Sequence, residues 1–259
     1  MKLILSGEHF KHDGICFKCL NCNVLISIKH NTIWEHKQLS VLQCLRIFVA
    51  FQSGSSIADV ARQWEIGEDT VSNLYFLFKT KVHEYISNPY IMKMTIFIKT
   101  NEFQIYEIDE SILLNVKKDQ DIIETQWIFG ILERETGKCF LKRIHDRSAA
   151  VLIPLVMEHV PPGSIVITDS LTSYNQLSEY YFYYTVNHSK NDYQHTDWLP
   201  GHEHRFLVTT NSIERIWHGL KGRLSHHSHH TPGEIDLVLD HITFIQNKFS
   251  LLDLLKPHR

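Results

Sequence analysis

Three acidic residues have the chemistry and the placement of a metal-dependent phosphoryl-transfer site. Asp109 and Asp169 lie in short apolar runs, and Glu214 lies in a segment with helical spacing. Hard divalent cations such as Mg²⁺ prefer oxygen ligands, and two of them can clamp the attacking and leaving oxygens of a phosphodiester. An ionised Asp at the end of a buried strand is costly unless a cation compensates its charge. These residues are therefore candidate ligands of two Mg²⁺ ions.

The segments around these acids predict an α/β domain. Apolar runs with short breaks predict strands at 105–113, 126–134, 138–146, 164–169 and 180–187. Helical spacing predicts helices at 148–160, 212–224 and 232–249, whereas 190–208 is expected to be an irregular polar loop. This succession is that of a ribonuclease H-like domain, in which the first strand, the fourth strand and a late helix converge at one metal site. We therefore expect a ribonuclease H-like catalytic core over residues 105–250.

Residues 36–88 predict a helical region of the helix-turn-helix type. Ser40 is the expected cap of its first helix, and Gly67 allows a tight turn between two further apolar helical faces. The last of these helices would present three short polar side chains to base edges in the major groove of DNA: Thr70, Ser72 and Asn73. It begins with Glu68 and Asp69, which are unfavourable against phosphate, so a purely structural helical hairpin is the alternative.

Residues 1–35 predict a small β-rich knuckle. Three cysteines follow one another with the spacing C-x2-C-x2-C: Cys16, Cys19 and Cys22. C-x2-C on a tight turn is one half of a zinc ribbon, but a structural zinc site needs four ligands, and only His9 and His12 precede the cysteines as partners. The alternative is a degenerate knuckle with free thiols. The odd number of cysteines, five, argues against a disulfide framework and suits a reducing compartment.

The net charge of −3 hides an uneven distribution of charge. Residues 1–100 hold 11 Lys and Arg against 8 Asp and Glu, residues 101–204 hold 8 against 16, and residues 205–259 hold 7 against 5. Basic flanks of this kind could meet phosphates, although ordinary surface variation is an equally open interpretation. The sequence has neither an apolar run long enough to span a membrane nor a secretory signal at its start. We expect a protein that is not secreted and has no membrane partner.

Several short motifs, in one order along the chain, resemble a known family. They are EIDES at 107–111, QWIFG at 126–130, ERETGKCF at 133–140, DRSA at 146–149, Pro162-Gly163 with Thr168-Asp169, Tyr174, VNHS at 186–189, and TNSIE at 210–214 with Trp217 and Lys221. Over roughly 105–248 the chain resembles the Merlin superfamily of DNA transposases and the related bacterial insertion-sequence transposases. The upstream knuckle and helix-turn-helix region are similar to the N-terminal region of that family.

The resemblance implies roles for particular residues. Asp109, Asp169 and Glu214 match the catalytic triad of acids. In some bacterial relatives the third role belongs to an Asn and a Lys of the same segment, and here Asn211 and Lys221 occupy those positions. Asn211 and Glu214 are three residues apart and share a helical face, so either could coordinate metal, while Lys221 could contact phosphate. Glu214 is the favoured ligand because a carboxylate neutralises the ion better.

The resemblance also implies an activity and its partners. A transposase of this kind uses Mg²⁺ or Mn²⁺ to cleave a strand at each end of its element, and the freed 3′-hydroxyl then attacks target DNA without a covalent enzyme intermediate. The expected partners are double-stranded DNA, as terminal inverted repeats and target, and a second protomer or higher oligomer, because two ends must be joined. The expected compartment is the nucleus in a eukaryotic host and the cytoplasm otherwise.

The chain departs from the family pattern in three ways, which keeps two other functions open. The first Cys pair of the zinc ribbon is missing, the loop 190–208 is long, and the recognition helix starts with acids. These departures fit a copy that has lost mobility. The alternatives are a domesticated, catalytically inactive DNA-binding protein and a ribonuclease H-like nuclease that does not recognise terminal repeats.

Three further residues have an expected position. Glu110 follows Asp109 and should point to the opposite face of its strand, so it is not expected to be a ligand. Trp217 is expected in the core. His188 has two open interpretations, since it could approach the site or be an ordinary loop residue.

Overall fold

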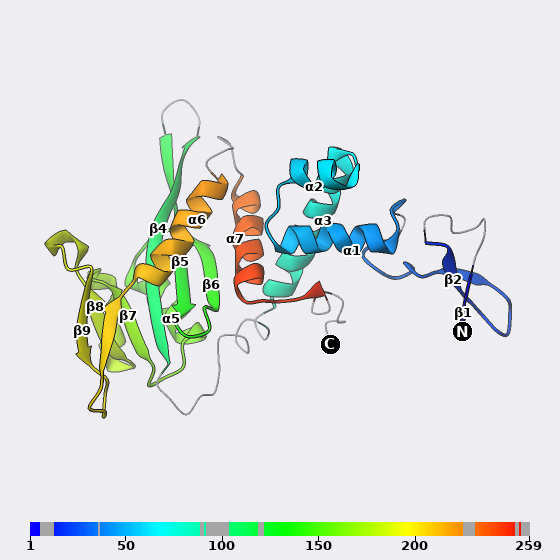
Figure 1. The fold of residues 1–259 in the computed structure, drawn as a ribbon. Helices are drawn as coiled ribbons and strands as arrows, with labels where there is room; N and C mark the ends of the chain where they lie inside the picture. The colour runs from blue at the N-terminus through cyan, green and yellow to red at the C-terminus, as the bar shows by residue number, and fades with distance from the viewer. Residues whose placement is uncertain are drawn as a thin grey trace. The chain divides into compact units, whose positions relative to one another are not determined.

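The computed structural model describes residues 1–5, 13–35, 37–88, 91, 104–118, 122–224, 231–251 and 254. The chain divides into two compact units, one of Met1–Lys81 with Ser250–Arg259 and one of Val82–Phe249 (Figure 1). His9 and His12, the expected partners of the cysteines, lie outside the described residues. None of the helices in the described part of the chain is long and apolar enough to cross a membrane.

The first unit contains a small sheet followed by helices. Strands β1 (Lys2–Leu5), β2 (Ile15–Lys18) and β3 (Leu25–Ser27) form an antiparallel three-stranded sheet. Helices α1 (Val41–Gln52), α2 (Ile57–Trp64) and α3 (Glu68–Ile86) follow, and α3 runs on into the second unit. The β-rich start and the helices match the elements that the sequence predicts, whereas zinc binding and DNA binding by these elements stay predictions.

Local sequence explains why the helices begin and pack as they do. The side chain of Ser40, the predicted cap, accepts a hydrogen bond from the Gln43 amide, and the Gln43 side chain accepts one from the Ser40 amide in return. The apolar face of α1 meets that of α3, where the rings of Phe48 and Phe78 lie edge to face with centroids 5.0 Å apart. This contact lies among the buried residues of the first unit, to which α2 contributes Val60 and Ala61.

The second unit is built on a mixed five-stranded sheet in the order β6-β5-β4-β7-β8. Its strands are β4 (Ile105–Lys118), β5 (Ile122–Glu133), β6 (Cys139–Ile144), β7 (Ile165–Asp169) and β8 (Phe182–Val186). Neighbouring strands are antiparallel from β4 to β6, and β7 and β8 run parallel to β4, so β5 alone opposes the other four. The predicted α/β class is confirmed, and this strand order fits the predicted ribonuclease H-like succession.

Helices cover both faces of this sheet. They are α5 (Ala149–His159), the 3₁₀ helix η2 (Thr172–Glu179), α6 (Asn211–Leu224) and α7 (Pro232–Gln246). Leu141 of β6 packs in one hydrophobic cluster with residues of α6 and α7, whereas the ring of its neighbour Phe140 stacks on His159 of α5 at 3.8 Å. Because successive strand residues point to opposite faces, α6 and α7 lie on one face and α5 on the other (Figure 1).

One segment differs from the sequence-based expectation. Residues 190–208, expected to be an irregular loop, contain strand β9 (Gln194–Trp198) and all but the last residue of β10 (Arg205–Thr209). The two strands pair antiparallel as a separate two-stranded sheet. The expectation was wrong because β9 has polar residues at nearly every position and so lacks apolar alternation. The short 3₁₀ helix η3 (His188–Lys190) precedes this hairpin.

A partly buried acid between α3 and α7 gives the second unit a predicted pH dependence. Asp240 accepts a hydrogen bond from His83 Nδ1 at 2.5 Å, and burial raises the pKa of Asp240 to about 6, with the His83 contact opposing the rise and the charge of Asp236 adding to it. The folded protein therefore holds this proton more tightly than the unfolded chain. Stability from Asp240 is complete below about pH 4 and is lost as the pH rises through about 6, at roughly 1.4 kcal/mol per unit.

We expect Asp240→Asn to remove this pH dependence. Between pH 4 and 6 the free energy of unfolding should fall less in Asp240→Asn than in the unmodified protein, as measured by urea titrations at each pH. Glu158→Gln, which replaces an exposed carboxylate of α5, is the control and should keep the original slope. Equal slopes in all three proteins would contradict the prediction.

Candidate active site

Asp109 lies on β4, partly buried and facing α6. Trp217 Nε1 donates a hydrogen bond to Asp109 Oδ2 at 2.9 Å, and the Trp217 side chain is only 4% exposed, so the expected core position of this residue is confirmed. Gly130 of β5 pairs with Asp109 across the sheet. A Cβ atom at Gly130 would lie 2.5 Å from Trp217 Cη2 and 2.9 Å from Ile213 Cδ1. The absence of a side chain at this position thus lets α6 approach the sheet closely enough to reach Asp109.

The other two predicted acids come from β7 and α6. Asp169 is the last residue of β7, the parallel neighbour of β4, and its Oδ1 accepts a hydrogen bond from the Leu171 amide at 3.0 Å. Glu214 lies in the first turn of α6, and its Oε1 accepts a hydrogen bond from the Thr210 hydroxyl at 2.9 Å. Asp169 thus lies at the carboxyl end of the strand beside β4, and Glu214 lies at the start of the helix that contacts Asp109 through Trp217.

The charges of Asp169 and Glu214 act on Asp109. Burial raises the pKa of Asp109 to about 7; the hydrogen bond from Trp217 opposes this rise, and the charges of Asp169 and Glu214 both add to it. Negative charge concentrated in this way is what a divalent cation would offset, and an all-oxygen donor set suits Mg²⁺ or Mn²⁺. Within the described ranges no group of three or more His, Cys, Asp or Glu is arranged to hold a metal ion. The chemistry of the donors fits the cation, and the role of each acid stays a prediction.

The charges of the candidate site also act on Glu110, which the sequence did not suggest. Burial raises the pKa of Glu110 to about 8, the charges of Asp109 and Asp169 raise it further, and Arg147 opposes the rise. Its Oε1 is buried and has no hydrogen-bond partner among the residues that the structure describes. Strand alternation still places Glu110 on the face opposite to Asp109, as expected, but Asp169 acts on both residues.

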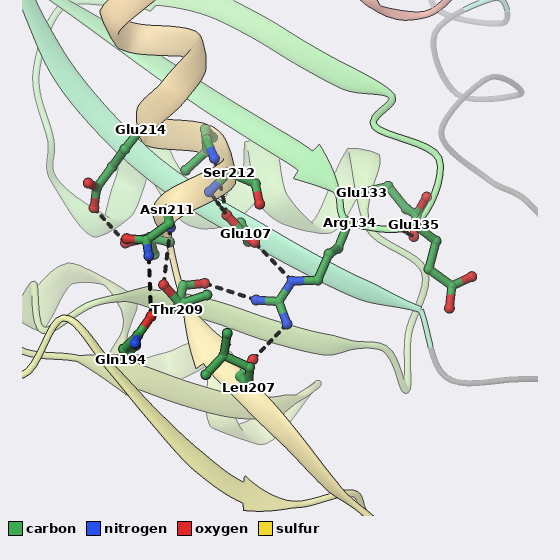
Figure 2. A network of polar contacts seen from close by, with 12 residues as sticks. Glu107, Glu133, Arg134, Glu135, Gln194, Leu207, Thr209, Asn211, Ser212 and Glu214 are labelled. Carbon is green, nitrogen blue, oxygen red and sulfur yellow. Dashed lines mark hydrogen bonds and ion pairs between the residues drawn. The ribbon is translucent and has the colours of Figure 1, made fainter.

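The alternative third ligand, Asn211, makes a polar contact with β9. Asn211 is the first residue of α6, and its Nδ2 lies 3.5 Å from Gln194 Oε1 on β9, toward which it points in Figure 2. Lys221 is exposed seven residues beyond Glu214, about two turns along the same helix. Asn211, Glu214 and Lys221 therefore follow one another along α6, and the choice between Asn211 and Glu214 as ligand stays open.

His188 approaches the site, which favours the first of its two interpretations. Its Nε2 lies 3.4 Å from Glu214 Oε1 and 3.5 Å from the Thr210 hydroxyl. Its ring also packs against Tyr193, with centroids 5.2 Å apart. The turn η3 thus places a histidine beside the carboxylate of α6.

A buried ion pair beside these acids was missed from the sequence. Glu107, two residues before Asp109 on β4, has no exposed side-chain surface and pairs with Arg134 Nε at 2.9 Å (Figure 2). The spacing of Glu107 could have indicated this residue from the sequence. Residues i and i+2 of a strand point the same way, so Glu107 is a second acid on the face of the apolar strand that carries Asp109.

The remaining predicted residues lie in the first unit. Cys16 is buried in β2, and Cys19 and Cys22 flank a turn that the Asn23 amide closes on the Cys19 carbonyl at 3.0 Å. The pKa of Cys19 falls to about 7 because the backbone of Cys22 and then that of Asn21 hydrogen-bond its sulfur. Such a turn suits a thiolate ligand, and zinc binding stays a prediction.

The predicted base-reading residues are exposed on one helix. Thr70, Ser72 and Asn73 all lie on the surface of α3, while Val71 and Leu74 between and beside them are buried. The helix therefore presents its short polar side chains to solvent.

Comparison with known proteins gives the family. The model of the ISXO2-like transposase domain matches residues 107–240. No curated protein matches the chain.

Solved structures give distant matches. They include a chain of the simian T-cell lymphotropic virus intasome in complex with PP2A regulatory subunit B56 gamma (10% identity, TM-score 0.33, covering 74% of this chain and 66% of that chain). A second match is the Mos1 strand transfer complex, with 10% identity and a TM-score of 0.20, covering 54% of this chain and 56% of that chain. A third is a pre-cleavage Mos1 transpososome, with 11% identity and a TM-score of 0.24, covering 83% of this chain and 80% of that chain. Because the family match spans more than half of its residues, the chain belongs to the ISXO2-like transposase domain family.

Proposed function

We propose that this member of a transposase family is a DDE-type enzyme that cleaves DNA at the terminal inverted repeats of its element and joins the freed ends to target DNA. The observation that carries the proposal is the hydrogen bond from Trp217 Nε1 to Asp109 Oδ2 at 2.9 Å, because it ties α6, which carries Glu214, to β4, which carries Asp109. Asp169 ends β7, the parallel neighbour of β4. The strand order of the sheet and the family match support a ribonuclease H-like core for this chemistry. The Merlin superfamily remains our proposal for the nearest group of elements.

The residues of the proposed site have different roles. Asp109, Asp169 and Glu214 would hold Mg²⁺ or Mn²⁺, with Asn211 as the alternative to Glu214. Bound divalent cations supply Lewis-acid activation and orientation of the phosphodiester oxygens. The Thr210 hydroxyl orients Glu214 through its hydrogen bond to Oε1, and Trp217 orients Asp109 in the same way. Lys221, two turns along α6, would contact phosphate.

Each part of the chain also has a proposed role. Residues 1–35 would form the degenerate zinc-ribbon-like knuckle, 36–88 the helix-turn-helix region, and 105–250 the catalytic domain. Two element ends must be joined, so the active form would be a dimer or a higher oligomer on double-stranded DNA. The protein would act in the nucleus of a eukaryotic host and otherwise in the cytoplasm.

The test is strand cleavage on the genomic DNA that flanks the gene. The full chain would be incubated with duplexes of these flanks and a target plasmid, in Mg²⁺ or Mn²⁺. Cleavage at an inverted repeat followed by joining to the plasmid supports the proposal. Cleavage without joining or end preference would indicate a nuclease, and end binding without cleavage would indicate a domesticated DNA-binding protein.

DNA preference is expected to depend on α3. In the full chain, replacing Thr70, Ser72 and Asn73 together by Ala should reduce the preference for element ends over unrelated duplex by roughly tenfold or more, because each good base contact discriminates by about 1–3 kcal/mol. Affinity for unrelated DNA should change little and should fall as salt rises, since Lys and Arg contacts to phosphate dominate it.

Gel shifts at several salt concentrations measure both quantities. Gln63→Ala, an exposed change on α2, is the control and should leave end preference unchanged. If the triple variant keeps its preference, α2 and α3 are a structural hairpin and end recognition lies elsewhere in the chain.

A further inference from the structure

Glu107 is a fully buried carboxylate that belongs to none of the proposed ligand positions. Its Oε1 accepts a hydrogen bond from Arg134 Nε at 2.9 Å. Its Oε2 accepts two more, from the backbone amides of Ser212 at 2.8 Å and Ile213 at 3.1 Å (Figure 2). A strand residue therefore binds the start of α6, a helix that lies more than a hundred residues later in the chain.

This contact replaces the usual cap of the helix. The first amides of a helix lack intrahelical acceptors, and the side chain of the preceding residue normally accepts from the second or third of them. In α6 that preceding residue is Thr210, but its hydroxyl donates to Glu214 Oε1 instead, at 2.9 Å. Because Glu107 supplies the acceptor, Thr210 is available to orient Glu214.

Arg134 extends the same network to the strand that leads into the helix. Its Nη1 donates to the Leu207 carbonyl at 2.6 Å and its Nη2 donates to the Thr209 carbonyl at 2.9 Å. Both carbonyls belong to the end of β10, which pairs with β9 and not with the main sheet. One ion pair thus fixes the end of β10 and the start of α6 together.

The network and the proposed site share a strand. Glu107 and Asp109 are two residues apart on β4 and point to the same face. Glu107 binds α6 at Ser212 and Ile213, and Asp109 binds it again at Trp217. Glu214 lies between these two attachments, so the rotation of α6 that directs Glu214 is set from both sides.

We propose that Glu107 and Arg134 are a positioning pair that sets α6 on β4 so that Glu214 faces Asp109. The inference rests on the proposed function for its catalytic consequence. A neutral cap would satisfy the amides of α6 without the cost of burying a charge, so stability alone does not account for an acid with no exposed surface. A carboxylate accepts from three donors in two directions at once, which ties the helix to both β4 and β10.

The test compares Glu107→Gln with Glu133→Gln. Gln has the size of Glu but offers one acceptor oxygen, and its NH₂ group would face donors, so it cannot bind Arg134 and α6 together. Glu133 is an equally buried acid at the end of β5, and its carboxylate accepts from the Glu135 amide and from the amide and hydroxyl of Thr136, all in the turn after β5. Glu133→Gln therefore removes a buried carboxylate nearby without touching the helix.

The first readout needs neither metal nor DNA. In the metal-free protein, amide hydrogen exchange in the first turn of α6 should speed up by about tenfold or more in Glu107→Gln and stay unchanged in Glu133→Gln. The second readout is the Mg²⁺ concentration for half-maximal strand cleavage, which should rise ~10–100-fold in Glu107→Gln alone, with the KM for DNA unchanged.

Arg134→Lys keeps the charge beside Glu107 but loses the paired contacts to Leu207 and Thr209, so it should raise the Mg²⁺ requirement while leaving the amides of α6 capped. It also keeps the test decisive if Glu107→Gln does not fold. The inference is overturned if Glu107→Gln has the Mg²⁺ requirement of the unmodified protein. If Glu107→Gln does not fold, the same result in Arg134→Lys overturns it. It is also overturned if α6 exchange in Glu107→Gln matches that in Glu133→Gln. An unmodified protein that does not cleave DNA would instead refute the proposed function, and the exchange measurement would still decide whether Glu107 holds α6.

Discussion

Asp109→Asn and Asp169→Asn are each expected to lower the rate of strand cleavage by about a thousandfold or more. A bound divalent cation stabilises the transition state of phosphoryl transfer by several kcal/mol, and each 1.4 kcal/mol corresponds to a factor of ten in rate. An Asn keeps the shape of the side chain, and at position 109 it can still accept the hydrogen bond from Trp217, but it removes the charge proposed to hold the cation. Cleavage of an end-labelled duplex in Mg²⁺ measures the effect.

DNA binding and folding should survive both substitutions. Neither residue lies in the helical region proposed to bind DNA, so gel-shift affinity for element ends should stay within about twofold. Glu179→Gln, which replaces an exposed carboxylate on η2, is the matched control and should cleave at the rate of the unmodified protein. Full cleavage by Asp109→Asn and Asp169→Asn would remove both residues from the proposed site and with them the proposed chemistry.

Gly130→Ala is expected to destabilise the protein by roughly 2–3 kcal/mol, which is large for one added methyl group. The new Cβ would lie 2.5 Å and 2.8 Å from two ring atoms of Trp217 and 2.9 Å from Ile213 Cδ1, so α6 must move away from the sheet. Both neighbours are buried and cannot turn aside. The movement should also break the hydrogen bond from Trp217 to Asp109, so cleavage should fall together with stability.

A Gly→Ala substitution on α6 itself has the opposite expected effect on stability. Gly219 is exposed, and nothing lies within 4 Å of a Cβ added there, so Gly219→Ala should stabilise the protein by up to ~1 kcal/mol through helix propensity. Urea titrations of both variants measure the two effects. A Gly130→Ala protein as stable as the unmodified one would show that α6 does not pack on β5 as closely as described.

The parts of the fold with regular apolar spacing could be predicted from the sequence. Strands β4 and β7, helix α6 and the positions of Asp109, Asp169 and Glu214 on them follow from patterns of a few residues. The ends of the strands follow less closely from such patterns: the first strand is predicted to end at 113, whereas β4 continues to Lys118. Residues such as Asn115 and Lys117 interrupt the apolar alternation, although backbone pairing with β5 continues past them.

Contacts between distant segments could not be predicted in this way. Arg134 gave no local signal, because its partners lie on β4 and β10. The position of His188 beside Glu214 likewise depends on how η3 and α6 meet in space. Local periodicity identifies the strand or helix that carries a side chain, but only tertiary packing determines which distant backbone atoms it binds.

The wide separation between Glu107 and its helix has a consequence for how the protein is made. During synthesis Arg134 emerges 27 residues after Glu107, and the amides of α6 emerge more than a hundred residues after it, a delay on the order of ten seconds. The meander β4-β5-β6 and its ion pair can therefore form while one face of the nascent sheet still lacks α6 and α7. During that interval Ile128 and Leu132, later covered by these helices, are open to water and to other chains. A ribosome that stops before α6 would release an incomplete sheet with an exposed apolar face, and this fragment would lack Glu214, the third proposed acid.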